Sequence, residues 1–163
     1  MALATGMPFD APAETLNAKT GAWQLTVTTL TSGNPLPADV LAKMPPDERA
    51  KVEEAMKARA GKPSTETFKT CITQADLNQN RMIRSEDDDS NCKKKVLSHT
   101  STKHVITQTC PPPRASSGQA TIEAKTPESI VASIDTIQAD GNGKIRVDIK
   151  GRWLGVSCEG IEQ

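Results

Sequence analysis

The chain contains very few aromatic residues. Among its 163 residues are two Trp, two Phe and no Tyr. Sites for carbohydrates and single-stranded nucleic acids stack their ligands on aromatic rings, and many protein interfaces are anchored by Tyr or Trp. The composition therefore disfavours all three kinds of site. Because aromatic side chains dominate the energetics of small cores, we expect Trp23 and Trp153 to be core residues.

The chain also lacks net charge, since 20 Lys and Arg are balanced by 20 Asp and Glu. A nucleic-acid-binding protein normally shows a basic excess, so we expect no nucleic acid partner. One basic run, Lys93-Lys94-Lys95, follows the acidic run Glu86-Asp87-Asp88-Asp89. We interpret these runs as a solvated strand beside a solvated acidic loop, with a site for phosphate or anionic lipid as the alternative.

Long apolar runs are missing as well. No stretch approaches the roughly 18 apolar residues of a membrane span, and Met1 to Ala13 have neither the basic start nor the apolar centre of a signal peptide. Residues 1–19 show no periodicity, and we expect them to be disordered or a vector remnant. With the disulfides proposed below, this indicates a mature chain whose export signal has been removed.

No catalytic motif stands out: there is no Gly-rich phosphate loop, Gly-x-Ser-x-Gly or His-Glu-x-x-His. The two histidines, His99 and His104, have no third metal ligand nearby, and we expect both to be exposed at a hairpin tip. Residues 76–87 match the first positions of a calcium loop, but Arg81 stands where that loop needs glycine. A polar turn is the favoured interpretation, and we expect no metal, no cofactor and no enzymatic activity.

What the chain does have is four cysteines. Cys92 and Cys110 flank two strand-like runs, at 93–98 and 104–109. If the chain turns about Ser101, the two sulfurs face each other. The same register pairs the apolar side chains, Val96 with Ile106 and Leu97 with Val105.

The second disulfide, by elimination, joins Cys71 to Cys158 and encloses a long loop. Persistent disulfides need an oxidising compartment, so we expect the protein to be exported. In the chain-entropy description, the hairpin bridge contributes about 3 kcal/mol and the long bridge about 4–5 kcal/mol. These contributions are large for a domain whose total stability is about 5–15 kcal/mol.

Hydrophobic periodicity predicts a sheet with one helical insert. Residues alternating between apolar and polar predict seven strands, at 21–30, 64–72, 93–98, 104–109, 118–125, 130–138 and 144–154. Pro45 and Pro46 divide the helical insert at 38–60 into a short turn, 38–43, and a main helix, 47–59. The thin apolar stripe of that helix, which includes Val52 and Met56, predicts a lid packed on the sheet.

We therefore predict an α+β fold that is mainly antiparallel β. About seven strands form a bent meander sheet or a partly open barrel, with one inserted helix. A single disulfide-bonded domain spans residues 20–160.

Several segments of this pattern are similar to one known family. They are the Gly21-Ala22-Trp23 opening, Cys71-Ile72-Thr73, the Cys92…Cys110 hairpin, and the ending Gly151-Arg152-Trp153-Leu154-Gly155…Cys158. Together they resemble the bacterial domain-of-unknown-function family numbered thirty-six seventeen, whose members are exported proteins of Gram-negative bacteria. The resemblance implies a periplasmic or surface location and structural disulfides. It implies no activity and supplies no catalytic residues.

Our first functional hypothesis is an exported, non-enzymatic protein that binds a small apolar ligand between sheet and helix. The residues expected to line the site, or a plain packed core, are Trp23, Leu25, Val27, Val52, Met56, Ile134, Ile145, Val147 and Ile149. The alternative is a module for protein–protein interaction or envelope structure, acting through the helix or the Lys93-Lys94-Lys95 strand. A metal-dependent enzyme is the least favoured hypothesis.

Overall fold

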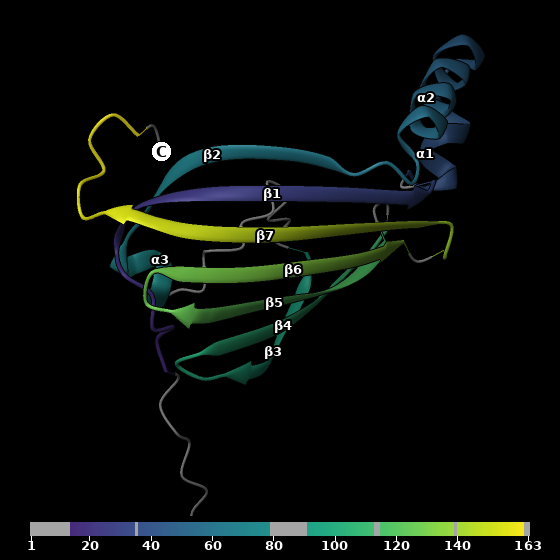
Figure 1. The fold of residues 1–163 in the computed structure, drawn as a ribbon. Helices are drawn as coiled ribbons and strands as arrows, with labels where there is room; N and C mark the ends of the chain where they lie inside the picture. Colours follow the sequence, from purple (N-terminus) through teal and green to yellow (C-terminus); the bar gives the residue numbers. More distant parts are fainter. Residues whose placement is uncertain (1–13, 35, 79–90, 113–114, 139, 162–163) are drawn as a thin grey trace, which may run out of the picture.

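The computed structural model describes residues 14–34, 36–78, 91–112, 115–138 and 140–161. They form one seven-stranded antiparallel sheet with three short helices (Figure 1). The elements are β1 (Gly21–Gly33), α1 (Ala38–Lys43), α2 (Pro46–Arg59), β2 (Ser64–Ile72), α3 (Gln74–Asn78), β3 (Lys93–His99), β4 (Lys103–Cys110), β5 (Ser116–Thr126), β6 (Ser129–Gln138) and β7 (Gly143–Gly155). The sheet is bent and does not close into a barrel, so the predicted fold class is confirmed.

The strand order is β2-β1-β7-β6-β5-β4-β3. Strands β3 to β7 follow one another as a meander of antiparallel pairs. The first strand, β1, then pairs with the last, β7, from Ala22↔Gly155 to Gly33↔Gly143. The first and last strands thus pair inside the sheet, as its second and third strands, and β2 and β3 form its edges.

The register separates the strand residues into two faces of different character. On one side, here called the inner face, Trp23, Leu25 and Val27 of β1 stand opposite Trp153, Gly151 and Ile149 of β7. On the other side, the outer face, β7 carries Lys144, Arg146, Asp148 and Lys150, as the alternation predicts. The large buried side chains of the sheet, Trp23, Ile72, His104, Ile122 and Ile130, lie on the inner face, where α3 also packs.

Two glycines of the family-like segments are explained by close contacts. A Cβ at Gly151 would lie 2.4 Å from Cγ1 of Ile130 and 3.0 Å from Cδ2 of Leu25, so this position gives room for its neighbours' side chains. Gly21 has φ of 121°, and its Cβ would lie 2.3 Å from the carbonyl oxygen of Gly155. Only glycine fits either position without moving the backbone or the core.

Both predicted disulfides are present. Cys71 and Cys158 are joined across 87 positions, with 5.6 Å between their Cα atoms. Cys92 and Cys110 are joined across 18 positions, with 4.2 Å between Cα atoms. The described part of the chain contains no free cysteine.

The hairpin register is confirmed up to Val96↔Ile106, but the predicted pairing of Leu97 with Val105 is wrong. A β-bulge leaves Leu97 unpaired, and Ser98 stands opposite Val105 instead. The bulge shifts the pairing by one residue, so His99 stands opposite His104 before the turn. Thr100 closes this turn by donating its backbone N–H to the carbonyl oxygen of Lys103, at 3.0 Å.

The helix boundaries are confirmed, but the predicted lid is wrong. Helices α1 and α2 divide at the paired prolines. However, α2 has no buried residue and projects away from one end of the sheet (Figure 1). The physical reason is that Val52 and Met56 are its only large apolar side chains, a stripe too narrow for a core-facing helix.

Substituting Gly151→Ala should lower the free energy of unfolding by about 1–3 kcal/mol, because the added methyl group overpacks the contact with Ile130. Gly155→Ala is the matched control. A Cβ there meets no atom within 4 Å, so the change should stay within about 0.5 kcal/mol. Urea denaturation of the oxidised variants measures both free energies of unfolding. Equal losses in the two variants would contradict the explanation that Gly151 makes room for Ile130.

Loss of the long disulfide should destabilise the fold more than loss of the hairpin disulfide. The paired variants are C71S/C158S and C92S/C110S, and chain entropy predicts losses of about 4–5 and about 3 kcal/mol. The measurement is the free energy of unfolding at constant pH. A greater loss of stability in C92S/C110S than in C71S/C158S would contradict the chain-entropy explanation of the two disulfides.

Candidate functional site

The end of the inner face near Trp23 is filled by a small core. Trp23 has 0 % exposure and packs with Ile72, Leu77 and Ile130. Leu77 comes from α3, whose start is capped by Thr73: the Oγ1 of Thr73 accepts the backbone N–H of Asp76 at 3.2 Å. This short helix therefore closes one end of the inner face.

A segment of residues 14–20, here called the N-terminal strap, lies beside the same core. Leu16 is only 2 % exposed. The backbone N–H of Asn17 donates to the carbonyl oxygen of Ser101 at 2.6 Å, and that of Lys19 donates to Pro127 at 2.8 Å. Residues 1–13 of the segment expected to be disordered lie outside the described residues. The burial of Leu16 could not be recognised from sequence, since this residue follows no apolar periodicity.

The two Trp side chains hold the strap at its other end. The Nε1 of Trp23 donates to the carbonyl oxygen of Lys19 at 2.9 Å, and the Nε1 of Trp153 donates to Thr20 at 3.0 Å. The ammonium group of Lys19 lies 4.3 Å from the ring centroid of Trp153 and also pairs with Glu128. Trp23 thus belongs to the core as expected, whereas Trp153 is only half-buried.

The histidines form a close pair, which corrects the prediction that both are exposed. His104 is 2 % exposed, on the inner face opposite Ile122, and its ring centroid lies 4.0 Å from that of His99. Its Nε2 lies 3.2 Å from the carbonyl oxygen of Glu14 and donates to it. Burial, and then repulsion from His99, lower the pKa of His104, while backbone hydrogen bonds to Glu14 and Thr100 oppose the shift.

The pKa of His104 predicts that the fold weakens in mild acid. Its pKa is lower in the folded state than in the unfolded chain, so the unfolded chain binds the proton first as pH falls. Stability from this group is therefore complete above about pH 6.5 and declines below it. His104→Gln should flatten this part of the profile, as measured by unfolding free energy from pH 7.5 to 5 in about half-unit steps. Identical pH profiles for variant and parent would contradict the assignment.

Beyond this core, the inner face continues as an apolar strip that is only partly covered. Six of the predicted lining residues share it at half-buried positions: Leu25, Val27, Ile134, Ile145, Val147 and Ile149. Val27 of β1 stands opposite Ile149 of β7, and Ile134 of β6 stands opposite Val147 of β7. Of the other three, Trp23 lies in the filled core, and Val52 and Met56 lie on α2, which the structure does not bring to this strip. We call the six strand residues the apolar strip.

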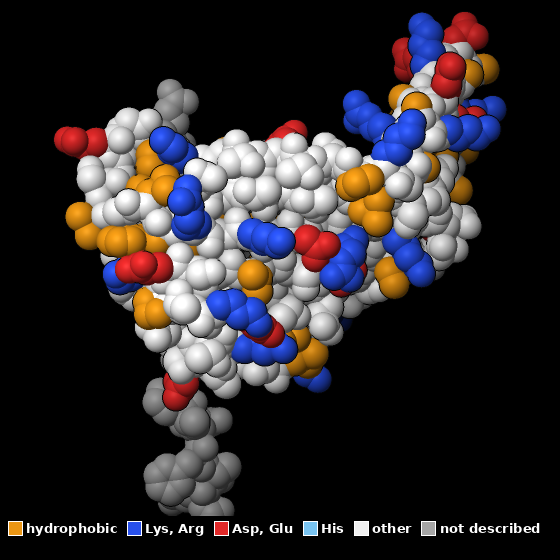
Figure 2. Space-filling model, in the orientation of Figure 1, with side chains coloured by type: hydrophobic (Ala, Val, Ile, Leu, Met, Phe, Trp, Pro, Cys, Tyr) orange, Lys and Arg blue, Asp and Glu red, His pale blue; other side chains and the backbone are white. Residues whose placement is uncertain are grey.

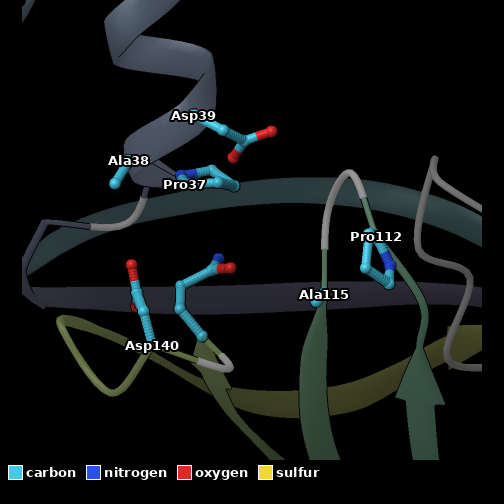
Figure 3. A pocket seen from close by; sticks show the side chains of 7 residues that line it. Pro37, Ala38, Asp39, Pro112, Ala115 and Asp140 are labelled. Carbon is cyan, nitrogen blue, oxygen red and sulfur yellow. The ribbon is translucent and has the colours of Figure 1, made fainter.

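A hollow of about 370 Å³ lies at the far end of the inner face (Figure 3). Its lining comes from the start of α1, the β4–β5 connection and the end of β6. The lining residues are Pro37, Ala38, Asp39, Pro112, Ala115, Gln138 and Asp140. None of the nine predicted lining residues is among them. The sequence signal for this site is weak, because its walls come from three connections far apart in the chain.

Gln138 connects this hollow with the apolar strip. It faces inward opposite Ser116 of β5, four residues along β6 from Ile134. Its Oε1 is buried and has no hydrogen-bond partner among the described residues. An unpaired buried acceptor is costly unless a donor reaches it, so the hollow offers a place for a hydrogen-bond donor.

Side chains for metal binding do not converge in the part of the chain that the structure describes. No three His, Cys, Asp or Glu residues there are grouped closely enough to hold a metal ion. Of the calcium-like segment 76–87, residues 79–87 lie outside the described residues, and Asp76 hydrogen-bonds Thr73 at the start of α3. No described helix is long and apolar enough to cross a membrane.

The fold and its crosslinks define a class: a small disulfide-bridged β protein with an open antiparallel sheet. The disulfides suggest an oxidising location outside the cytoplasm. The chain belongs to the family described as "Protein of unknown function (DUF3617)", whose profile matches residues 18–158. No curated protein matches the chain, and no solved structure matches it.

Proposed function

We propose that this is an exported, non-enzymatic binding protein that holds an apolar ligand against the inner face of its open sheet. The supporting observation is the apolar strip, whose side chains remain half-buried while the core beside Trp23 is filled. A contiguous apolar surface on one face of a sheet favours a binding site when it remains accessible to solvent. The disulfides favour an oxidising compartment, and the resemblance to exported proteins of Gram-negative bacteria makes the periplasm or the cell surface the compartment of this proposal.

The ligand that fits this geometry has a long apolar tail and a polar head. Ligand sites combine mostly apolar walls with a few placed polar groups. The apolar strip supplies the walls, and the unpaired Oε1 of Gln138 supplies an acceptor beside the hollow. A head that carries a hydrogen-bond donor, such as a hydroxyl or protonated carboxyl group, would lie at Gln138, with its tail along β6 and β7.

A second candidate function is a module for protein–protein interaction or envelope structure. The observation in its favour is α2, a 14-residue helix without a buried residue that projects from the sheet. We do not propose metal-dependent catalysis, because no described group of ligand side chains supports it.

The double variant I134N/V147N should bind a fluorescent fatty acid about tenfold or more weakly than the parent. Two neighbouring side chains of the apolar strip then lose their contact with the tail. The measurement is the dissociation constant from a fluorescence titration, with thermal melts to show that both proteins are folded.

Ser133→Asn is the control, because Ser133 directly precedes Ile134 on β6 but lies on the outer face, opposite Asp148. It should leave the dissociation constant unchanged. No saturable binding to the parent protein, or an equal loss in the control, would contradict the proposed site.

A further inference from the structure

The outer face carries a concentration of positive charge that the composition hides. One end of it bears five cations, here called the basic patch: Lys69, Lys103, Lys125, Lys150 and Arg152. All five side chains belong to exposed residues. Figure 2 shows this face, with Lys and Arg side chains spread over its left and central parts.

The register brings these cations together from separate strands. Lys69 of β2 and Arg152 of β7 both stand opposite Gln24 of β1, two strand spacings or about 10 Å apart. Lys150 lies two residues from Arg152 on the same face of β7. It stands opposite Val131 of β6, which in turn stands opposite Glu123 of β5. The patch therefore spans most of the width of the sheet.

Acidic groups compensate only part of this charge. Within the basic patch, Glu123 is the single described acid, and it pairs with both Lys103 and Lys125. The other end of the outer face adds four cations, Lys93, Lys95, Lys144 and Arg146, and two acids, Asp135 and Asp148. Nine cations less three acids leave six positive charges on the described outer face of a chain whose net charge is zero.

Exposed apolar side chains adjoin the basic patch. Leu154, left unpaired by a bulge between β1 and β7, and Val156 follow Arg152 directly along the chain. Val156 is 82 % exposed. Cations beside protruding aliphatic groups match a bilayer surface, where the cations meet lipid phosphates and the aliphatic groups enter the interface. An acidic protein partner would not explain the aliphatic groups, and its interface would favour aromatic anchors.

We propose that the outer face adsorbs to an anionic lipid bilayer through the basic patch, with Leu154 and Val156 at its edge. This inference goes beyond the proposed ligand site and does not depend on it, because the two use opposite faces of the sheet. Adsorption through the outer face leaves the apolar strip unobstructed.

The test is sedimentation of the full chain with vesicles of phosphatidylglycerol and phosphatidylcholine. The protein should sediment with these vesicles at low ionic strength, and neither with phosphatidylcholine alone nor in about 1 M salt, where the Debye length is about 3 Å. The triple variant K69Q/K150Q/R152Q should lower the partition coefficient about a hundredfold, since each surface cation contributes about fivefold. None of these residues is buried, so the fold should be retained.

The matched control is K51Q/K57Q/R59Q, which removes the same charge from α2. It should bind vesicles far better than the triple variant. Equal losses in the two variants, no binding of the parent, or binding to polyglutamate but not to vesicles would each overturn the proposal. The same triple variant, K69Q/K150Q/R152Q, should bind the fluorescent fatty acid as tightly as the parent, because the proposed ligand site lies on the opposite face. The fatty-acid titration therefore tests the ligand site separately from vesicle binding.

Discussion

The pairing of β1 with β7 is the constraint on which the rest of the structure depends. It joins the first and last strands of the chain over twelve residue pairs, at the entropic cost of closing a loop of more than a hundred residues. The Cys71–Cys158 disulfide supports the same closure, because it ties β2, the other neighbour of β1, to the segment after β7. Gly21 and Gly151 make the close approach possible. Without this pairing, Trp23 would leave the core and the inner face would lose its first strand.

Once β1 and β7 are aligned, alternation gives the two faces opposite chemistry. The same strands that present Val27, Ile149 and Val147 inward present Lys150 and Arg146 outward. A small domain with a modest core cannot cover so large a sheet with three short helices. Among the described elements, α3 and the N-terminal strap cover one end of the inner face, and the start of α1 borders the hollow at the other end. The fold is thus stabilised by crosslinks and a local core, and within the described part of the chain the side chains of the apolar strip stay half-buried.

The strand pattern and the hairpin disulfide could be predicted from sequence because they follow local rules, and the Cys71–Cys158 disulfide then followed by elimination. Period-two alternation located the strands, and the spacing of Cys92 and Cys110 determined most of their hairpin. The bulge at Leu97 could not be predicted, because the alternation of apolar and polar residues does not show where a strand takes up an extra residue. Nor could the position of α2: its boundaries follow from Pro45 and Pro46, but whether Val52 and Met56 pack on the sheet is a tertiary property. The hollow was missed for the same reason, since Pro37, Pro112 and Gln138 become neighbours only after folding.

Native mass spectrometry of the full chain, purified without denaturation from its own compartment, tests the central claim most directly. The account predicts a mass four hydrogens below that of the reduced chain, for two disulfides. It also predicts a noncovalent apolar adduct that organic solvent removes and that the variant I134N/V147N does not retain. Four free thiols would contradict the structure, and a parent protein that carries no adduct and takes up no fatty acid would contradict the function assigned to its inner face.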